Sequence, residues 1–441
     1  STQEHCYNLF DRLIEYQQFI EHMHRNSKAC EFFLKDVNNI NKLYFNDVSS
    51  YTRHKVYVTT KILYKLSYDK LFIVNNSDYI SPHNIFFIIS TSDCDKEILS
   101  HLLQIFNNII KNVESNYSSL KMPNVLLRLW KKYHEIRLIE KILKIIENLY
   151  LDESIIRELL DLDLIDIIID TLKDSKIDSD GMYNLLVTIS KLMFYRFFAS
   201  KIIEQKTINS LIDTVSMNIF NTKIVDKILI IFTKAAKLDK NFITILGVYG
   251  MNNFCINILS KYMSTCHYNI IRQTIELIFF QISDENNLRF FSRAESMDII
   301  LKTFKFNIKQ RDQVLLSLKL INIIINKDFE LKMSRKAKGD PDMTFDFTIL
   351  IEIINEILFN YDEFIDIIMQ ICDLMGNIFK VSEEVWLKKL MMDVIINNAD
   401  KYLQKLDYIE VFVNTLYHMI KADKTMLDLD SNSILDRKSV V

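Results

Sequence analysis

The feature that most constrains the fold of this chain is a short pattern that recurs along nearly its whole length. A large apolar residue is followed two places later by an amide or cationic residue, and the next residue is again apolar. Nine segments show it, and successive polar members lie 40 to 55 residues apart. A period in this range is typical of a helical solenoid, in which each repeat stacks on its neighbours. The polar members, called the ladder positions below, are Lys65, Asn108, Asn148, Lys191, Lys234, Gln281, Asn322, Asn377 and His418.

The segments between ladder positions predict three helices per repeat. Residues 134–149 carry apolar side chains at helical spacing, and residues 154–173 read as a short helix, a turn near Asp161, and a second helix. No such unit can bury its apolar faces alone, so neighbouring units must stack. We therefore expect a short, a medium and a long helix in each repeat, with the ladder position near the end of the long one. The medium helices are expected to begin near Pro82, Pro123, Ile165, Ile208, Met251 and Met297.

Composition excludes several other classes of protein. Five glycines and three prolines in 441 residues are too few for the turns of a sheet-rich fold or for a phosphate-binding loop. A net charge of −3 argues against a protein that binds nucleic acid or anionic membrane through bulk charge. Six scattered cysteines without a CxxC motif predict free thiols in a reducing compartment, the cytoplasm or alternatively the nucleus. No apolar run approaches 18 residues, so we expect no membrane span.

With these features the chain resembles the armadillo-repeat family over about residues 46 to 421. The resemblance implies an all-α, right-handed α-solenoid (an armadillo-like superhelix) of about eight to nine three-helix repeats. We expect residues 1–45 to form a helical cap around an amphipathic segment, 4–24. Residues 46–421 would form the array, with an inserted loop at 332–347, and residues 422–441 a flexible tail.

In the armadillo family, an asparagine near the end of each long helix often lines a concave groove and clamps the backbone of an extended peptide. Four of the ladder positions match that asparagine, and Gln281 keeps the amide; the matching residues are Asn108, Asn148, Asn322 and Asn377. The other four ladder positions, Lys65, Lys191, Lys234 and His418, depart from it. The family also favours glycine before the medium helix, where only Gly250 fits; Asp163, Lys206 and Ser296 stand at the other turns. The tryptophan that nuclear-import adaptors place one turn before the asparagine is absent, which argues against an import adaptor.

The functional hypothesis is a non-enzymatic scaffold or adaptor whose ladder side chains are exposed along a groove. A carboxamide has one acceptor and two donors, so it can bind the backbone of an extended or helical partner segment regardless of its sequence. Lys191 and Lys234, in adjacent repeats, would favour acidic or phosphorylated ligand residues. We find no catalytic motif, and we expect no catalytic residue, no cofactor and no small-molecule substrate.

Two other classes of function stay open, a nucleic-acid-associated helical repeat protein and a structural subunit of a large complex. The first has some support from a basic and aromatic patch, although the net charge makes nucleic acid an improbable partner. The patch consists of Arg128, Trp130, Lys131, Lys132, Tyr133 and Arg137. We expect no metal site, because the N-terminal histidines and cysteines match no zinc-binding spacing. Those residues are His5, Cys6, His22, His24 and Cys30.

Overall fold

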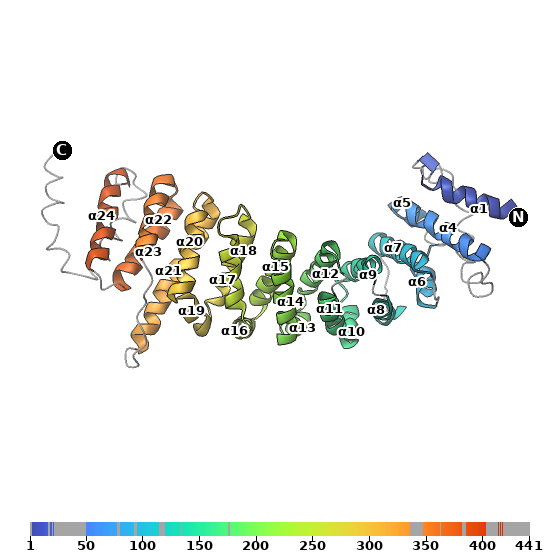
Figure 1. Cartoon of the computed structure of the whole chain (residues 1–441), viewed down its shortest axis with the longest axis horizontal. Coiled ribbons are helices and arrows are strands. Elements are labelled where there is room, and N and C mark those ends of the chain that lie inside the picture. Colours follow the sequence, from blue (N-terminus) through green and yellow to red (C-terminus); the bar gives the residue numbers. More distant parts are fainter. Residues whose placement is uncertain are drawn as a thin grey trace. The chain divides into compact units, whose positions relative to one another are not determined.

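In the computed structural model nearly all of the described residues lie in helices, and there is no strand among them (Figure 1). The described residues are 2–15, 50–76, 80–91, 95–113, 120–133, 135–174, 177–335, 347–361, 363–381 and 385–402, with single positions at 18, 19, 21, 413, 415 and 417. The chain divides into two compact units, Ser1–Ile228 and Leu229–Val441, and each is described by itself.

The first unit contains the N-terminal helix and the repeats that follow it. Its helices are α1 (Thr2–Leu13), α4 (Ser50–Leu66), α5 (Lys70–Asn75), α6 (Pro82–Thr91), α7 (Lys96–Asn112), α8 (Met122–Lys132), α9 (Ile136–Asn148), α10 (Glu153–Asp161), α11 (Leu164–Lys173), α12 (Ser179–Leu192), α13 (Arg196–Ile202) and α14 (Gln205–Met217). Helix α15 (Thr222–Leu238) contains the boundary between the two units.

The second unit is also built from helical repeats. Its helices are α16 (Lys240–Val248), α17 (Met251–Tyr262), α18 (Tyr268–Gln281), α19 (Glu285–Phe291), α20 (Ala294–Phe306), α21 (Arg311–Arg335), α22 (Phe347–Asn360), α23 (Ile365–Val381) and α24 (Val385–Tyr402). Within the described part of the chain, no single helix combines the length and the apolar character needed to cross a bilayer. Helices α16 and α17 do so only as a pair, bent by 75° at their junction.

The predicted order of short, medium and long helix is confirmed. Five complete triplets follow one another in the described chain, namely α5–α7, α10–α12, α13–α15, α16–α18 and α19–α21, and two pairs, α8–α9 and α22–α23, lack only a described short helix. Each of the six predicted medium helices begins within three residues of its expected start. The sequence therefore predicted both the repeat and its three helices correctly.

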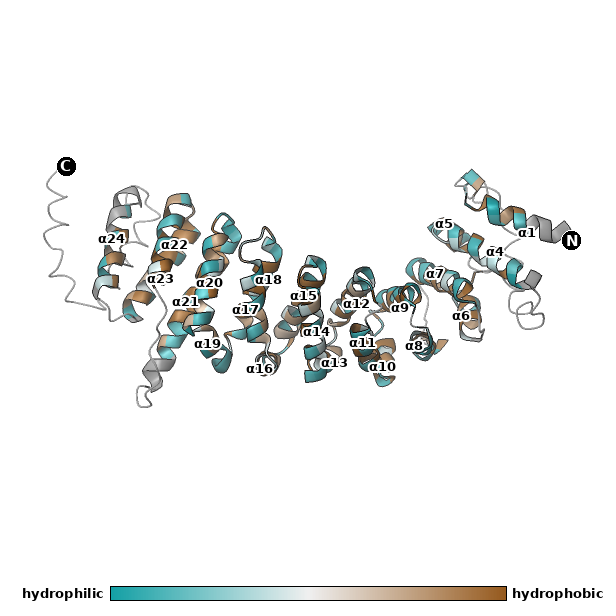
Figure 2. Ribbon diagram, in the orientation of Figure 1, coloured by the Kyte–Doolittle hydropathy of each residue, from teal (hydrophilic) through white to brown (hydrophobic). Residues whose placement is uncertain are grey.

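Each repeat is stabilised by burying apolar stripes against the next one. In α9 the residues at spacings of three and four are buried, as the alternating apolar and polar faces in Figure 2 illustrate. Long helices pack on long helices, α4 on α7, α7 on α9 and α9 on α12 in the first unit, and α18 on α21 and α21 on α23 in the second. This packing places successive long helices side by side within each unit. Seven ladder positions lie within four residues of the end of their long helix, as predicted. Asn322 does not, because α21 extends 13 residues beyond it to Arg335.

Three medium helices begin after a residue in the left-handed backbone conformation. Gly250 (φ 91°) precedes α17, as the family pattern predicts, and Asp163 (φ 66°) and Lys121 (φ 47°) take the same conformation before α11 and α8. The other two expected turn residues, Lys206 and Ser296, instead lie inside α14 and α20. These two helices follow residues in an extended conformation, which need no glycine.

The ends of the array differ in part from the prediction. Helix α1 is shorter than the expected 4–24 segment, but it packs on α4, and Lys61 of α4 forms ion pairs with Asp11 and Glu15 at 2.9 and 2.8 Å. The expected loop 332–347 is helical at both edges, because α21 extends to Arg335 and α22 begins at Phe347. Residues 336–346, the C-terminal tail 422–441 and most of the cap lie outside the described residues.

Candidate functional site on the ladder face

The described ladder positions differ in exposure and fall into three groups that the sequence pattern does not distinguish. Asn148, Lys191 and Lys234 are exposed, and Lys65, Asn322 and Asn377 are half-buried. Asn108 and Gln281 are buried, with 8% and 0% of their surface exposed, so the expectation that all ladder side chains are exposed is wrong for these two. His418 lies outside the described residues.

The ladder asparagines hydrogen-bond from one long helix to the next. Asn148 of α9 donates from Nδ2 to Oδ1 of Asn107 in α7 at 2.7 Å, and Asn377 of α23 donates to Oδ1 of Asn322 in α21, also at 2.7 Å. Asn148 keeps a second amide hydrogen and its carbonyl oxygen without a partner among the described residues. The amide hydrogens of Asn322 and the carbonyl oxygen of Asn377 also have no hydrogen-bond partner among the described residues. Each pair therefore fixes two repeats together and still presents both a donor and an acceptor.

Asn108 is buried because its carboxamide is occupied on both sides. Its Nδ2 donates to Oγ of Ser67 at 2.9 Å, and its Oδ1 accepts a hydrogen bond from Nε2 of Gln104 at 3.0 Å. Ser67 follows α4 directly, so the bond spans successive repeats. This asparagine holds the repeats together and has little capacity left for a ligand.

Gln281 is buried because a side chain from the following short helix closes over it. Asn287 of α19 donates from Nδ2 to Oε1 of Gln281 at 2.9 Å and to the backbone carbonyl of Ile243 at 3.2 Å. The Oδ1 of Asn287 accepts from Nδ2 of Asn252 at 2.8 Å. Asn287 is thus the centre of a buried amide cluster that joins α16, α17, α18 and α19, and the ladder pattern gave no indication of it.

The two lysines expected to form a basic centre are not equivalent. Lys191 forms an ion pair with Glu147 of α9, and its ammonium lies 6.0 Å from the ring centroid of Tyr150. The positive charge of Lys191 is therefore partly neutralised by Glu147. Lys234 belongs to the second unit and Lys191 to the first.

Helix α9 instead carries a basic stripe on the same face as its ladder asparagine. Arg137, Lys141 and Lys144 precede Asn148 by eleven, seven and four residues, so all four share one face of the helix. Lys141 donates from Nζ to Oγ and to the backbone carbonyl of Ser100 in α7, at 2.6 and 2.9 Å. Burial, and then the positive charges of Lys144 and Arg137, lower the pKa of Lys141 to about 8. The ladder pattern has one polar position per repeat and therefore did not include Lys141 and Lys144, although their helical spacing is visible in the sequence.

An aromatic cluster adjoins this stripe. The ring of His101 stacks on Tyr64 with centroids 5.2 Å apart, and Lys141 lies over the same tyrosine at 5.5 Å. Burial, and then the charges of Lys141, Lys61 and Lys65, lower the pKa of His101 to about 4, so its imidazole is neutral near neutral pH. The ladder face at α4, α7 and α9 therefore combines lysines, aromatic rings and an accessible carboxamide.

The basic and aromatic patch of α8 does not form a surface for stacking bases. Trp130 is 2% exposed and donates from Nε1 to Oγ1 of Thr171 at 3.1 Å. Arg128 donates to the backbone carbonyl of Ser90 at 2.8 Å. Since base stacking needs an open ring face, the ring of Trp130 is not available for it.

Comparison with known proteins agrees with this architecture. No protein-family model matches the chain, and no curated protein matches it. Among solved structures, a chain from a study of the phosphorylation switch that controls the interaction between cadherin and β-catenin is 10% identical. The likeness covers 91% of this chain and 81% of that one, with a TM-score of 0.56. Two designed armadillo repeat proteins, one in complex with the peptide (KR)4, are 11% and 13% identical over 56% of this chain and 99% of theirs, with TM-scores of 0.44 and 0.42. The chain has an all-α, armadillo-like solenoid fold.

Proposed function

We propose that this chain is a non-enzymatic scaffold or adaptor for protein–protein interaction that binds an extended or helical segment of a partner along the ladder face. One observation carries the proposal. Asn148 and the Asn322–Asn377 pair are fixed by hydrogen bonds between repeats and keep donors and acceptors that no described residue uses. A carboxamide held in this way is pre-organised for a peptide backbone, because little side-chain entropy is left to lose on binding.

The repeat spacing is compatible with such a ligand. Packed helices lie about 8–10 Å apart, and an extended chain advances about 3.3 Å per residue. One ladder position would therefore meet every second or third residue of the ligand. This gives backbone recognition at regular intervals, with the side chains between them left to decide specificity.

In the first unit, the stripe on α9 favours a ligand with acidic or phosphorylated residues. Arg137 and Lys144 are exposed, and they flank the half-buried Lys141 on the same helix face. A carboxylate or phosphate placed among them would form charge-assisted hydrogen bonds. One solved structure whose likeness covers 91% of this chain concerns an interaction that phosphorylation controls, which is consistent with this chemistry. At Lys191 a ligand carboxylate would have to compete with Glu147.

The proposal includes a reducing compartment, cytoplasmic or nuclear. Cys255 and Cys372 are free and buried, and burial raises the pKa of the Cys372 thiol to about 11. Such thiols are inert core residues, typical of proteins that do not depend on disulfides.

The ladder is tested by removing its accessible carboxamides. We expect the triple variant Asn148→Ala, Asn322→Ala and Asn377→Ala to lose at least one partner, with its affinity about ten-fold or more weaker, because each lost backbone hydrogen bond costs about 1 kcal/mol. Affinity capture from cell extract identifies partners, and titration of the purified partner gives the dissociation constant. The matched control is Asn253→Ala with Asn257→Ala, two exposed asparagines on medium helix α17. Identical partners and affinities for ladder variant, control and wild type would rule out the ladder as the binding surface.

The charge preference is tested separately with a fluorescein-labelled octaglutamate peptide as the probe. Replacing Arg137, Lys141 and Lys144 by glutamine should weaken its binding about ten-fold or more, because three charge-assisted contacts are lost. The control replaces three other exposed cations of the same unit, Lys121 directly before α8 and Arg128 and Lys132 within it, for the same change in net charge. For the wild type, binding should also weaken as the pH rises through about 8, where Lys141 loses its proton, and Lys141→Arg should abolish this pH dependence. Equal weakening by both triple variants would show bulk attraction and would contradict a specific site.

A further inference from the structure

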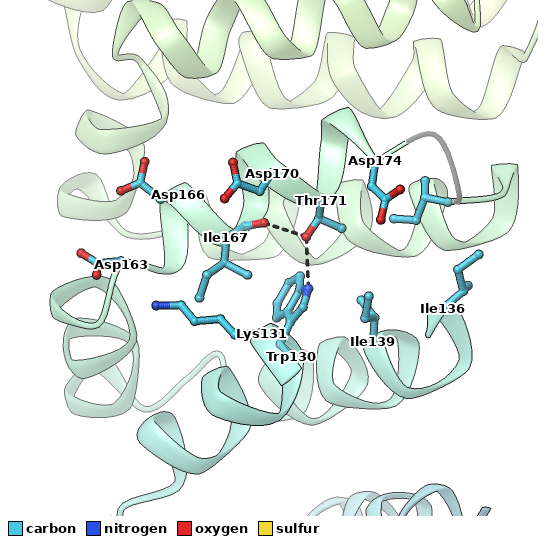
Figure 3. Close-up of a pocket in the computed structure, with 11 residues that line it drawn as sticks. Trp130, Lys131, Ile136, Ile139, Asp163, Asp166, Ile167, Asp170, Thr171 and Asp174 are labelled. Carbon is cyan, nitrogen blue, oxygen red and sulfur yellow. Dashed lines mark hydrogen bonds between the residues drawn. The ribbon is translucent and has the colours of Figure 1, made fainter. Parts of the chain in front are cut away.

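A pocket of about 420 Å³ opens in the first unit between α8, α9 and α11, away from the ladder positions (Figure 3). Its floor is apolar, formed by Trp130 of α8, Ile136 and Ile139 of α9, and Ile167 of α11. The bond from Trp130 Nε1 to Thr171 Oγ1 fixes the indole, as the dashed lines in Figure 3 show. The volume is within the range of about 300–1,000 Å³ that ligand sites occupy.

One wall of the pocket is a row of four aspartates. They are Asp163, Asp166, Asp170 and Asp174, at spacings of three, four and four residues. Asp166 and Asp170 share one face of α11, Asp163 directly precedes the helix and Asp174 directly follows it. The first three are exposed and the fourth is half-buried. Asp166 forms an ion pair with Lys206 at 2.7 Å, in which both side chains are 60% exposed, so the screened attraction is weak. Lys131, on the opposite side, is the one cation among the lining residues.

The repeat fold does not require an acidic row at this place. Helices α8 and α17 also begin after a left-handed residue, which aligns them with α11 position by position. At the same four positions, α8 has Lys121, Asn124, Arg128 and Lys132, and α17 has Gly250, Asn253, Asn257 and Lys261. The four carboxylates are therefore a property of this repeat alone among the three.

We propose that this pocket is a second docking site, for a basic segment of a partner protein with lysine or arginine at alternate positions. Such side chains have an apolar stem and a cationic head. The stem suits the isoleucine and tryptophan floor, and the head suits the aspartate rim. Charge complementarity thus selects the occupant that matches both surfaces at once.

The length of the aspartate row gives the spacing of the basic residues. From Asp163 to Asp174 a helix rises about 16 Å, which an extended chain covers in about five residues. Alternate side chains of an extended chain point to the same side. Three cations at positions one, three and five of the ligand would therefore face the four aspartates.

The arrangement does not suit a metal ion. Among the residues described, no three His, Cys, Asp or Glu side chains gather closely enough to hold one. Carboxylates spread along three helical turns instead match several separate cations along one strand of ligand.

The site is independent of the proposed ladder function. On α9 the pocket uses Ile136 and Ile139 at the start of the helix, whereas Asn148 is its last residue, about 13 Å or more along the axis. The two surfaces can therefore be disabled separately.

The experiment uses the whole chain with Trp386→Phe, which leaves Trp130 in the pocket floor as the sole tryptophan. The probe is a dansyl-labelled peptide Arg-Ala-Arg-Ala-Arg, compared with Arg-Arg-Arg-Ala-Ala of equal charge. We expect energy transfer from Trp130 to dansyl on binding, and an affinity several-fold higher for the alternating peptide. Replacing the four aspartates by asparagine should weaken binding about ten-fold or more and lower its salt dependence.

The matched control replaces four other exposed acids of the same unit by their amides, Glu158, Asp161, Asp180 and Asp213. Thermal unfolding of each variant checks that it is folded, which is expected because nearly all these positions are on the surface. Equal weakening by both sets, no preference for the alternating peptide, or no energy transfer would each overturn the proposal. So would displacement of the peptide by an equal concentration of spermine, which would show that any polycation suffices.

Discussion

Gly247→Ala is expected to lower the free energy of unfolding of the second unit by about 3 to 5 kcal/mol, because the added methyl group has no room. A Cβ atom at Gly247 would lie 1.9 Å from Oδ1 of Asn287, far inside van der Waals contact. Asn287 cannot move aside freely, because its carboxamide bonds to Gln281, Ile243 and Asn252 in a buried cluster. Moving it would leave these buried groups unpaired, at about 1–3 kcal/mol each.

Gly376→Ala is the matched control for that substitution. Gly376 is also helical and belongs to the same unit, in α23, but a Cβ there would meet no atom within 4 Å. Helix propensity alone should then raise the unfolding free energy by about 0.5–1 kcal/mol. Urea unfolding followed by circular dichroism measures both variants. If Gly247→Ala were as stable as Gly376→Ala, the close approach of Asn287 to the α16 backbone would be wrong.

Acidification should destabilise the first unit through His101, and His101→Phe should remove that part of the acid sensitivity. The folded state lowers the pKa of His101 from 6.5 to about 4, mainly because burial disfavours the imidazolium. Between these two values the unfolded chain binds a proton that the folded chain does not, so stability falls as the pH decreases from about 6.5 to 4. At about pH 4.5 the loss should reach about 2 kcal/mol relative to neutral pH. Phenylalanine keeps the ring that stacks on Tyr64 and cannot be protonated.

The measurement is the unfolding free energy of wild type and variant at about pH 7 and pH 4.5. Other groups titrate in both proteins and cancel in the difference, so the stability of the variant relative to wild type should rise by about 2 kcal/mol at the lower pH. His83→Phe removes an exposed imidazole from the same unit and serves as the control. An unchanged difference between wild type and His101→Phe at the two pH values would show that His101 is not the acid-sensitive group.

The sequence predicted the repeat better than it predicted the surface that the repeat builds. The period and the starts of the medium helices follow from local apolar spacing, which survives in any repeat that stacks. Whether a ladder side chain is exposed depends on a neighbour. Gln281 is covered by Asn287, and Asn108 is occupied by Ser67 and Gln104, while Asn148 is not covered. A pattern of three residues cannot contain that information.

Other features of the site follow helical spacing in the sequence, but their meaning depends on which helices pack beside them. The basic stripe of α9 and the acidic row of α11 both follow helical spacing, yet each became meaningful only beside its neighbouring helices. Trp130 was grouped with the cations around it, whereas the structure buries its ring against α11. Aromatic residues near charged ones cannot be assigned to core or surface until packing partners are known.

The step from Asn322 to Asn377 is the longest in the ladder, at 55 residues, and yet the two side chains meet at 2.7 Å. The extra residues are absorbed by the extension of α21 and the connection to α22, while α21 and α23 pack directly. The alignment of one repeat with the next therefore does not depend on how many residues connect their helices. A lineage of such proteins can gain or lose sequence in its links, and with it new regulatory or recognition elements, while inheriting the spacing of its contact points unchanged.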